Sequence, residues 1–385
     1  MRFKFDQIAI NSTAKKKPVP EDAAHYIGLE HLIPGTFDIA EWGSEVAPVG
    51  EKLLMKKGDV LFGRRRAYQR KVGIAPFDGI FSAHGMVLRP RSEVVDEKYF
   101  PFFISSDQFM NEAVRISVGS LSPTINWGTL KNCEFDLPPM DEQKKLAELL
   151  WAANDLKESY KKAITATDEM LKAKFREMFG DVGDDASRGE AEARSLSAKN
   201  VENAKSKWPM ICIGEIGRVC MCKRVLASQT KGVGDVPFYK ISTFGGVADS
   251  YISYEHYAEF KHKYSYPKKG DVLLSAAGTI GRCVVYDGEP AYFQDSNIVW
   301  IDNDETKVTN PFLFVCYRYI SWQTTKGGII ERLYNDNIRK TKIPLPPLSL
   351  QREFVAIADK AESAKANLKK SIAAIDQVMK GLINH

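Results

Sequence analysis

The residues that could do chemistry are few, and none belongs to a complete catalytic motif. Glu142 and Lys144 have the spacing of half a nuclease site. They fall in the first turn of an expected helix, however, where an acid complements the helix dipole. Asn310-Pro311-Phe312 lacks the second proline of the amino-methyltransferase motif and is better explained as the start of an apolar helix. Phosphate-loop, nucleophile-elbow and His-Glu-x-x-His motifs are absent from the sequence, so we predict a chain that catalyses nothing.

The side chains that bind metals also lack a suitable pattern. Of the six cysteines, only Cys220 and Cys222 are close in sequence, and the six histidines are scattered. No Cys/His cluster has the spacing of a zinc site. We therefore expect no metal and no cofactor, and we interpret the cysteines as reduced thiols.

One segment concentrates positive charge directly after a predicted strand. Five of its eight residues are cations, and like charges held together favour an anionic partner. Arginine suits phosphates and guanine edges, although a solvated loop is the plainer interpretation. From this segment we predict the DNA contacts Arg64, Arg65, Arg66, Tyr68, Gln69, Arg70 and Lys71.

Weaker candidates lie in the second half of the chain. Between Tyr251 and Tyr266 aromatic residues alternate with cations, a pattern that fits either nucleic-acid stacking or a core face with a solvated edge. The sequence does not separate these two interpretations. The candidates for DNA contact here are Lys223, Arg224, Lys240, Lys261, Lys263 and Tyr264.

Composition sets the class of protein without choosing a partner. The chain has 385 residues, 44% of them hydrophobic, with 54 basic and 49 acidic side chains, a net charge of +5. This length predicts two or three globular domains, and the mild positive charge permits a nucleic-acid partner. No apolar run approaches the roughly 20 residues of a membrane span, and charges fill the first residues, so we expect a cytoplasmic protein.

The elements that position these residues occur twice. Leu137-Pro138-Pro139 and Leu345-Pro346-Pro347 each open a helical run, at an offset of 346 − 138 = 208 residues. A di-proline can precede a helix but cannot lie inside one, and Asp141 and Ser349 are the expected N-cap residues. Each run covers about forty residues, which corresponds to roughly 60 Å of helix.

Both runs carry a narrow apolar seam with alternating steps of three and four residues, which is typical of helices that pair. The residues predicted for the helix pair or for partner docking are Leu146, Leu149, Leu156, Tyr160, Met170, Phe354, Ile357, Leu368, Ile375, Val378 and Leu382.

The repeat extends into the globular parts. Lys57-Gly58-Asp59-Val60-Leu61 matches Lys269-Gly270-Asp271-Val272-Leu273 at an offset of 212 residues. A period this long indicates a duplicated domain. The predicted parts are a globular unit at 1–137, a long helix at 138–180, a polar linker at 181–207, a second unit at 208–343 and a second helix at 344–385.

These paired motifs, together with the loop Gly278-Thr279-Ile280-Gly281-Arg282, resemble the specificity subunit of type I restriction–modification systems over nearly the whole chain. Two departures stand out. Glu142-Gln143 becomes Leu350-Gln351 in the second copy, and Arg66–Arg70 replaces the glycine-containing loop in the first. Within that loop we predict Thr279 and Arg282 as further DNA contacts.

The resemblance implies an α+β fold of two similar mixed α/β target-recognition domains. Two long antiparallel helices would join them in a coiled coil, as an internal pseudo-two-fold duplication. Each domain would read half of a bipartite double-stranded DNA site. The helices would set the spacer and dock two adenine-methyltransferase subunits, with room in the assembly for restriction (nuclease–translocase) subunits. The alternatives are a coiled-coil scaffold that binds only protein, and a metal-dependent nuclease that uses Glu142 and Lys144.

Overall fold

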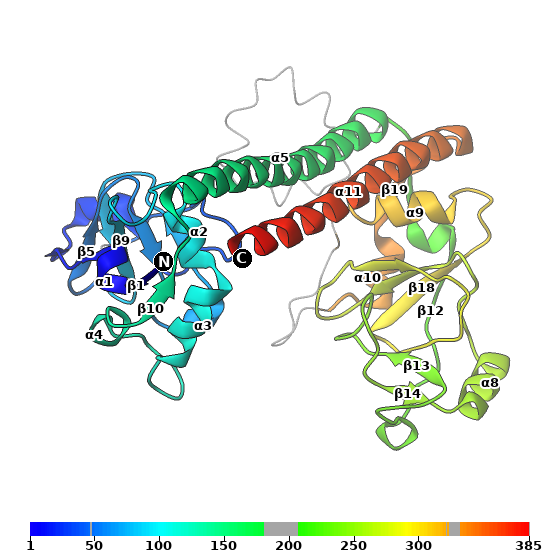
Figure 1. The fold of residues 1–385 in the computed structure, drawn as a ribbon. Helices are drawn as coiled ribbons and strands as arrows, with labels where there is room; N and C mark the ends of the chain where they lie inside the picture. The colour runs from blue at the N-terminus through cyan, green and yellow to red at the C-terminus, as the bar shows by residue number, and fades with distance from the viewer. Residues whose placement is uncertain (47, 181–206, 321, 323–331, 385) are drawn as a thin grey trace. The chain divides into compact units, whose positions relative to one another are not determined.

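The computed structural model describes residues 1–46, 48–180, 207–320, 322 and 332–384. The expected linker, apart from residue 207, lies outside them. The chain divides into two compact units: unit 1 is Met1–Lys162 with Leu368–His385, and unit 2 is Ala163–Asn367. The two longest helices, α5 (Met140–Phe179) and α11 (Leu348–Ile383), each contribute a part to both units (Figure 1).

Unit 1 is built on short strands with helices packed against them. Its strands are β1 (Arg2–Lys4), β2 (Ala9–Ser12), β3 (Lys15–Lys16), β4 (Tyr26–Ile27), β5 (Lys52–Met55), β6 (Val60–Phe62), β7 (Val72–Ile74), β8 (Gly79–Phe81), β9 (Met86–Pro90) and β10 (Glu134–Asp136). Its shorter helices are α1 (Phe5–Ile8), α2 (Phe100–Ser105), α3 (Asp107–Arg115) and α4 (Trp127–Leu130), with 3₁₀ turns η1 (Pro20–His25) and η2 (Ala67–Gln69).

Unit 2 has the corresponding elements. Its strands are β11 (Met210–Cys212), β12 (Gly217–Cys220), β13 (Val236–Tyr239), β14 (Tyr251–Ile252), β15 (Val272–Ser275), β16 (Cys283–Val285), β17 (Tyr292–Phe293), β18 (Ile298–Asn303) and β19 (Lys342–Pro344). Its helices are α8 (Tyr254–Lys263), α9 (Asn310–Cys316) and α10 (Asn335–Lys340), with 3₁₀ turns η5 (Ile213–Glu215) and η6 (Ala227–Gln229).

One sheet repeats strand by strand in the two units, and a second sheet repeats in part. A four-stranded sheet has the order β2-β9-β6-β7 in unit 1 and β12-β18-β15-β16 in unit 2, antiparallel throughout. A second sheet holds a parallel pair in each unit, β4 with β8 and β13 with β17. The fold is therefore a duplicated α+β fold, as predicted.

The repeated Lys-Gly-Asp segment is a turn with a clear physical basis. Gly58 and Gly270 have φ of +89° and +93°, the left-handed region that favours glycine. The carboxylate after each glycine closes the turn by accepting a backbone hydrogen bond, from Lys56 to Asp59 and from Lys268 to Asp271, both at 2.7 Å. Each turn feeds a buried central strand of its sheet.

Helix starts differ from the expectation in one respect. α5 begins at Met140 and α11 at Leu348, so Asp141 and Ser349 lie in the first turn and are not N-caps. The carbonyls of Pro139 and Pro347 accept the first backbone bonds of the helices instead. α2 and α3 are separate helices, because Ser106 between them has extended backbone and caps α3.

The buried glutamines are the most completely bonded feature of these helix starts. Gln143 accepts from the backbone N of Asp96 and donates to the carbonyls of Val94 and Pro138. Gln351 accepts from the backbone N of Thr309 and donates to the carbonyls of Lys307 and Pro346. Both are at most 1% exposed, so each glutamine fixes a long helix to its own unit.

The helix seam is displaced by one residue on α5. Leu149, Leu156 and Met170 are 57%, 44% and 48% exposed, whereas the neighbours one residue on, Leu150, Lys157 and Leu171, are buried. On α11 Phe354 is buried, and Leu368, Ile375 and Leu382 are half-buried. Val378 is 60% exposed, while its neighbour Met379 is buried. Ile357 and Tyr160 are half-buried, as is Leu146, which packs against the unit 1 core.

Hydrophobicity alone misplaced the seam because polar groups occupy several buried positions. In unit 1 the Nζ of Lys157 lies 3.1 Å from Asp376 Oδ1 and donates to the carbonyl of Gly35. In unit 2 Lys365 pairs with Asp168 and, at 3.1 Å, with Glu362. Burial by itself would lower the pKa of Lys365, but the two carboxylates outweigh it and raise that pKa. In each unit α5 and α11 lie antiparallel.

Candidate nucleic-acid interface

The basic segment, Arg64–Lys71, connects β6 to β7 in unit 1. Its centre is the turn η2, flanked by left-handed residues Arg66 (φ 57°) and Arg70 (φ 52°). At an offset of 278 − 66 = 212, Arg66 corresponds to Gly278, which has φ 67°. The turn therefore keeps its left-handed start without glycine, at a cost of about 1–2 kcal/mol. The backbone N of Arg66, bonded at 2.7 Å to the carbonyl of Pro123, helps to hold it.

Four of the five cations of the basic segment bond to the protein itself, and Arg64, Arg65 and Lys71 are three of them. Arg64 donates to the carbonyl of Ala83 at 3.1 Å, and Arg65 to Ser122 Oγ at 3.1 Å. Lys71 donates to the carbonyl of Leu29 at 2.6 Å. These side chains shape the segment, and their remaining positive charge stays close to the surface, since all three are half-buried.

The side chains of Arg66 and Tyr68 project from this segment. Both are exposed, Tyr68 by 55%, and Gln69 beside them is half-buried. Within the described part of the chain, the side chains of Arg66 and Tyr68 make no hydrogen bond or ion pair. A free guanidinium next to an exposed aromatic ring can contact a phosphate or base edge and stack on a base.

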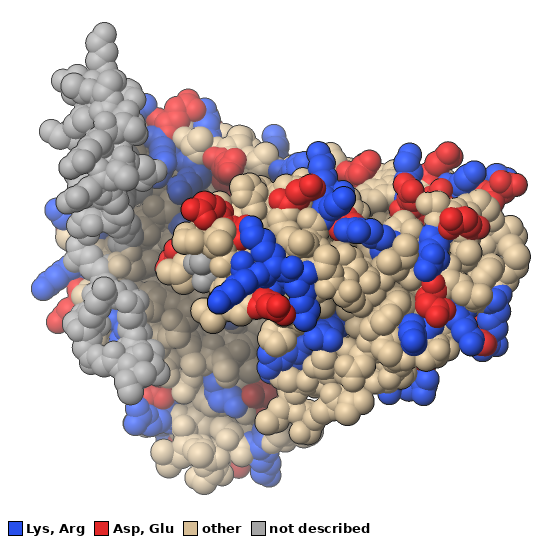
Figure 2. All heavy atoms as spheres, turned by 90° about the vertical axis from the view of Figure 1, so that its left-hand side faces the viewer, with Lys and Arg blue, Asp and Glu red and all other residues tan. Residues whose placement is uncertain are grey.

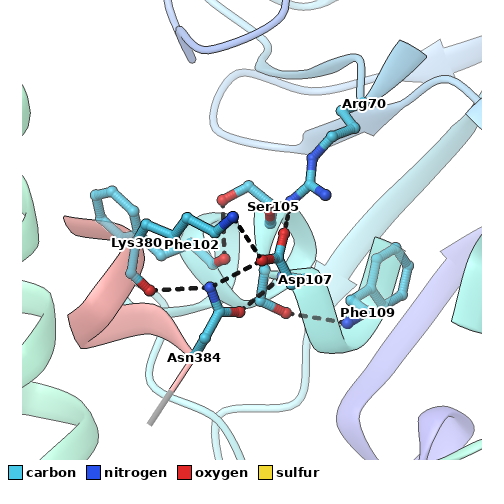
Figure 3. Close-up of polar contacts among 8 residues, drawn as sticks. Arg70, Phe102, Ser105, Asp107, Phe109, Lys380 and Asn384 are labelled. Atoms are coloured by element: carbon cyan, nitrogen blue, oxygen red, sulfur yellow. Dashed lines mark hydrogen bonds and ion pairs between the residues drawn. The ribbon is translucent and has the colours of Figure 1, made fainter. Parts of the chain in front are cut away.

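The side chain of Arg70 points toward the start of α3. Its guanidinium donates at 2.8 Å to the carbonyl of Ser105 and lies 2.8 Å from Asp107 Oδ1 (Figure 3). The other carboxylate oxygen of Asp107 lies 3.2 Å from Lys380 Nζ, on the last turns of α11. Burial alone would raise the pKa of Asp107, yet Lys380 and Arg70 lower it below its ordinary value.

The segment also faces a histidine that sequence reasoning passed over. His84 accepts through its carbonyl from the backbone N of Arg65 at 3.2 Å. Burial lowers the pKa of the His84 imidazole, and the nearby positive charges of Arg65, Arg64 and Lys52 lower it further. His84 therefore lies close to three positive charges at this surface.

The side of unit 1 that carries β5 faces the viewer in Figure 2, where Lys and Arg side chains lie interspersed with carboxylates. The register of β3 with β5 places Lys16 opposite Lys52, and Lys15 lies next to them. Lys15 and Lys16 form this short edge strand, and both are paired: Lys15 Nζ lies 3.5 Å from Glu51 Oε2, and Lys16 Nζ lies 2.9 Å from Asp22 Oδ1. Lys15 and Lys16 would have to exchange these carboxylates for phosphates in order to contact a nucleic acid.

In unit 2 three predicted contacts meet on converging loops. Arg224 Nε lies 2.9 Å from Asp295 Oδ2, and Lys240 Nζ lies 2.8 Å from Asp249 Oδ1. Arg282 donates to the carbonyl of Phe244 at 2.9 Å. Thr279 is exposed beside them. Carboxylates thus neutralise two of the three cations, and this loop cluster is less positive than the basic segment of unit 1.

The remaining predicted contacts of unit 2 lie on and beside α8. Lys261 donates to Tyr257 Oη at 2.9 Å, and Lys263 lies 2.9 Å from Glu259. The Nζ of Lys223 is 5.0 Å from the ring centroid of Tyr264, which is 44% exposed. The face of α8 that carries Tyr257 is buried in the core, which favours the core-face interpretation of this segment.

Sequence reasoning missed Asp107 and the two buried glutamines. The glutamines had a usable signal, because Gln143 and Gln351 recur at the offset of 208 although their neighbours change. Asp107 had only a weak one, a Ser-Asp pair at a helix start. Among the described residues, no group of three or more metal-binding side chains is found, and no helix is long and apolar enough to cross a membrane.

The fold and these surfaces define a class of protein: two related α+β units that carry divergent loops on a shared pair of antiparallel helices. A family model described as the type I restriction modification DNA specificity domain matches residues 42–166 and 205–377. The chain belongs to this family.

Relatives agree with the assignment. A putative type I restriction enzyme specificity subunit of Haemophilus influenzae is 55% identical over 172 residues, which are 44% of this chain and 45% of that protein. The match therefore spans less than half of this relative's length. The putative MjaX specificity subunit of Methanocaldococcus jannaschii is 22% identical over 343 residues, 85% of this chain and 77% of that protein.

Solved structures share the fold. The S subunit of a type I restriction–modification system from M. genitalium aligns over 100% of this chain and 94% of its own, with a TM-score of 0.53 at 15% identity. A chain from a study of complex assembly and conformational transition of the type I system aligns over 100% and 96%, with a TM-score of 0.57 at 16% identity.

Proposed function

We propose that this chain is the non-catalytic specificity subunit of a type I restriction–modification complex. In this role each unit reads one half of a bipartite double-stranded DNA site. The observation that carries the proposal is the repeated sheet scaffold with unlike loops at the same place, Arg66–Arg70 in unit 1 and Gly278–Arg282 in unit 2. Two readers of different sequences need a common frame and different contact residues.

In unit 1 the contacts divide by exposure. Arg66, Tyr68 and Gln69 are the residues we propose for base or phosphate contact, since the first two project freely. Arg64, Arg65 and Lys71 act through charge and by holding the segment in shape. This division follows the usual separation between contacts that position a protein on DNA and contacts that read sequence.

In unit 2 the proposed contacts are the exposed Thr279 and Arg282 with Arg224 and Lys240 beside them. The carboxylate partners of Arg224 and Lys240 can be exchanged for phosphates when DNA binds. Lys223, Lys261, Lys263 and Tyr264 flank this cluster, and we assign them a supporting role near the backbone.

The helices supply the proposed docking surface for methyltransferase subunits. Leu149 and Leu156 are one heptad apart on α5, so they lie on the same side of that helix in unit 1, and both are exposed. Met170 in unit 2 and Val378 on α11 are likewise exposed apolar side chains outside the seam. Exposed apolar rows on a helix mark protein-binding surfaces.

The docking surface has a direct test. The double variant Leu149→Ser with Leu156→Ser is expected to weaken copurification with a methyltransferase subunit while the melting temperature stays near wild type. The matched control is Ala152→Ser, also exposed on α5. Full copurification of the double variant would show that the partner docks elsewhere.

DNA reading is tested by selection from a random duplex library with the chain bound to methyltransferase subunits. We expect enrichment of two short blocks separated by an unread spacer of fixed length. A single block would restrict reading to one unit. No enrichment, with the partner demonstrably bound, would contradict DNA reading and leave a protein-binding scaffold.

A further inference from the structure

A polar network in unit 1 joins the end of α11 to the basic segment. Asp107, the first residue of α3, is its centre. One carboxylate oxygen faces Arg70 at 2.8 Å, and the other faces Lys380 at 3.2 Å. Figure 3 shows these side chains converging on Asp107 from a loop and from a helix that are far apart in the chain.

The contact with α11 is fixed by more than charge. The side-chain oxygen of Asn384 accepts from the backbone N of Asp107 at 2.8 Å, and its amide donates to the carbonyl of Lys380 at 2.9 Å. The backbone N of a residue in the first turn of a helix has no partner within the helix. Asn384, the residue directly after α11, supplies that partner and is itself bonded to Lys380 in the last turn of the helix.

This junction borders a cavity of about 530 Å³. Its polar lining includes Arg70, Asp107 and Lys380 at one part, with Lys157 and Asp376 of the helix pair also on the wall. Apolar side chains of the last turns of α11, the buried Met379 and the half-buried Leu382 and Ile383, pack against the unit 1 core. The polar network adds to this packing a charged contact with the start of α3, so a displacement of that last turn would also act on Asp107.

The other end of the network controls a strained turn. Arg70 is left-handed, and its side chain bonds to the carbonyl of Ser105 as well as to Asp107. Such conformations persist where surrounding contacts determine them. Arg70 is thus an anchor of η2, the turn that presents Arg66 and Tyr68.

We propose that Asp107 is a positioning residue that couples the last turn of α11 to the DNA-contacting segment of unit 1. The coupling rests on the proposed function, because it concerns how unit 1 reads its half-site. The position of the last turn of α11 then determines how strongly unit 1 distinguishes its half-site from other sequences, and it leaves recognition of the second half-site unchanged. A partner that binds or displaces that turn would therefore regulate recognition of the first half-site only.

The test uses the full chain bound to methyltransferase subunits and the two blocks found by library selection. For each block, the discrimination ratio is the dissociation constant for a duplex with that block scrambled, divided by the constant for the intact duplex. Asp107→Asn removes the negative charge at the centre of the network. Asn384→Ala removes the acceptor of the Asp107 backbone N without changing the net charge of the protein. Lys370→Ala, exposed on the same helix, is the control.

We expect Asp107→Asn and Asn384→Ala each to lower the ratio for the unit 1 block by at least about fivefold, a typical size for coupling between sites. The ratio for the other block and the melting temperature should stay near wild type. Combining the two substitutions should add little to either, since both act through one contact. Asp107→Glu should restore part of the discrimination.

Three results would overturn the coupling. The first is an unchanged ratio in Asn384→Ala, and the second is an equal fall for both blocks in a protein that still melts normally. The third is strict additivity of the two substitutions. Failure of the library selection itself would instead contradict DNA reading, so the two proposals fail by different measurements. A lowered melting temperature in Asp107→Asn would shift the decision to Asn384→Ala.

Discussion

Arg66 offers the sharpest test of DNA contact, because its side chain and its backbone can be separated. Its guanidinium is exposed, and its backbone occupies the left-handed region at φ 57°. Arg66→Ala removes the guanidinium and keeps the backbone strain. Arg66→Gly removes the guanidinium and relieves the strain, giving the turn the residue that unit 2 has at Gly278.

The magnitude follows from counterion release. Losing one phosphate contact makes the fall of log affinity with log salt concentration less steep, by about 0.9 in slope. Between about 50 and 200 mM salt this changes the ratio of wild-type to variant affinity by roughly 3.5-fold. If Arg66 reads a base edge instead, the loss is about 1–3 kcal/mol, is confined to one base pair, and leaves the slope nearly unchanged.

The assay is a titration of fluorescent duplex at several salt concentrations, combined with a melting curve. We expect both variants to lose affinity equally, with Arg66→Gly melting higher than Arg66→Ala. Arg2→Ala is the control, since it removes the same charge from β1 and Arg2 pairs with Glu134 at 2.9 Å. Wild-type affinity in Arg66→Gly would refute a side-chain contact, and an equal loss in Arg2→Ala would reduce the effect to net charge.

Four further predictions concern charge and burial. Phosphates near His84 should raise its lowered pKa, so that binding takes up a proton and DNA affinity rises as pH falls below about 6.5; this rise should be smaller in His84→Gln. The same lowered pKa makes the folded state lose stability in that acidic range, and His84→Gln should reduce this loss in melting curves. Lys365→Ala should lower the free energy of unfolding by about 1–2 kcal/mol in denaturant titrations. Asp168→Ala should lower it by less than about 1 kcal/mol, because Asp168 is exposed. Equal effects of the two substitutions would contradict this asymmetry. Gln351→Leu leaves three backbone groups without partners and should cost about 3 kcal/mol, against little change for the exposed Gln377→Leu.

The sequence predicted the frame better than the contacts, for physical reasons. The di-proline openings and the Gly-Asp turns depend on local backbone chemistry, which a sequence displays directly. The buried seam of α5 lies one residue away from the predicted one. Lys157 can be buried there because its ammonium group bonds to the carbonyl of Gly35 and pairs with Asp376, both remote in sequence. Likewise, nothing near Arg70 in the chain reveals that Asp107 holds it.

The duplication explains which parts of the molecule are free to change. Lys157 pairs with Asp376, and Asp168 pairs with Lys365; both lysines and both aspartates are related by 208 residues. The same ion pair therefore occurs twice with the partners exchanged between α5 and α11. Gln143 and Gln351 repeat in the same way at the helix starts. Every one of these contacts links the helices to each other or to the backbone of a unit, and none involves the loops at Arg66 or Gly278. Substitutions in the loops can thus alter what each unit contacts while the helix contacts stay satisfied, which is the property a family of DNA readers with different targets requires.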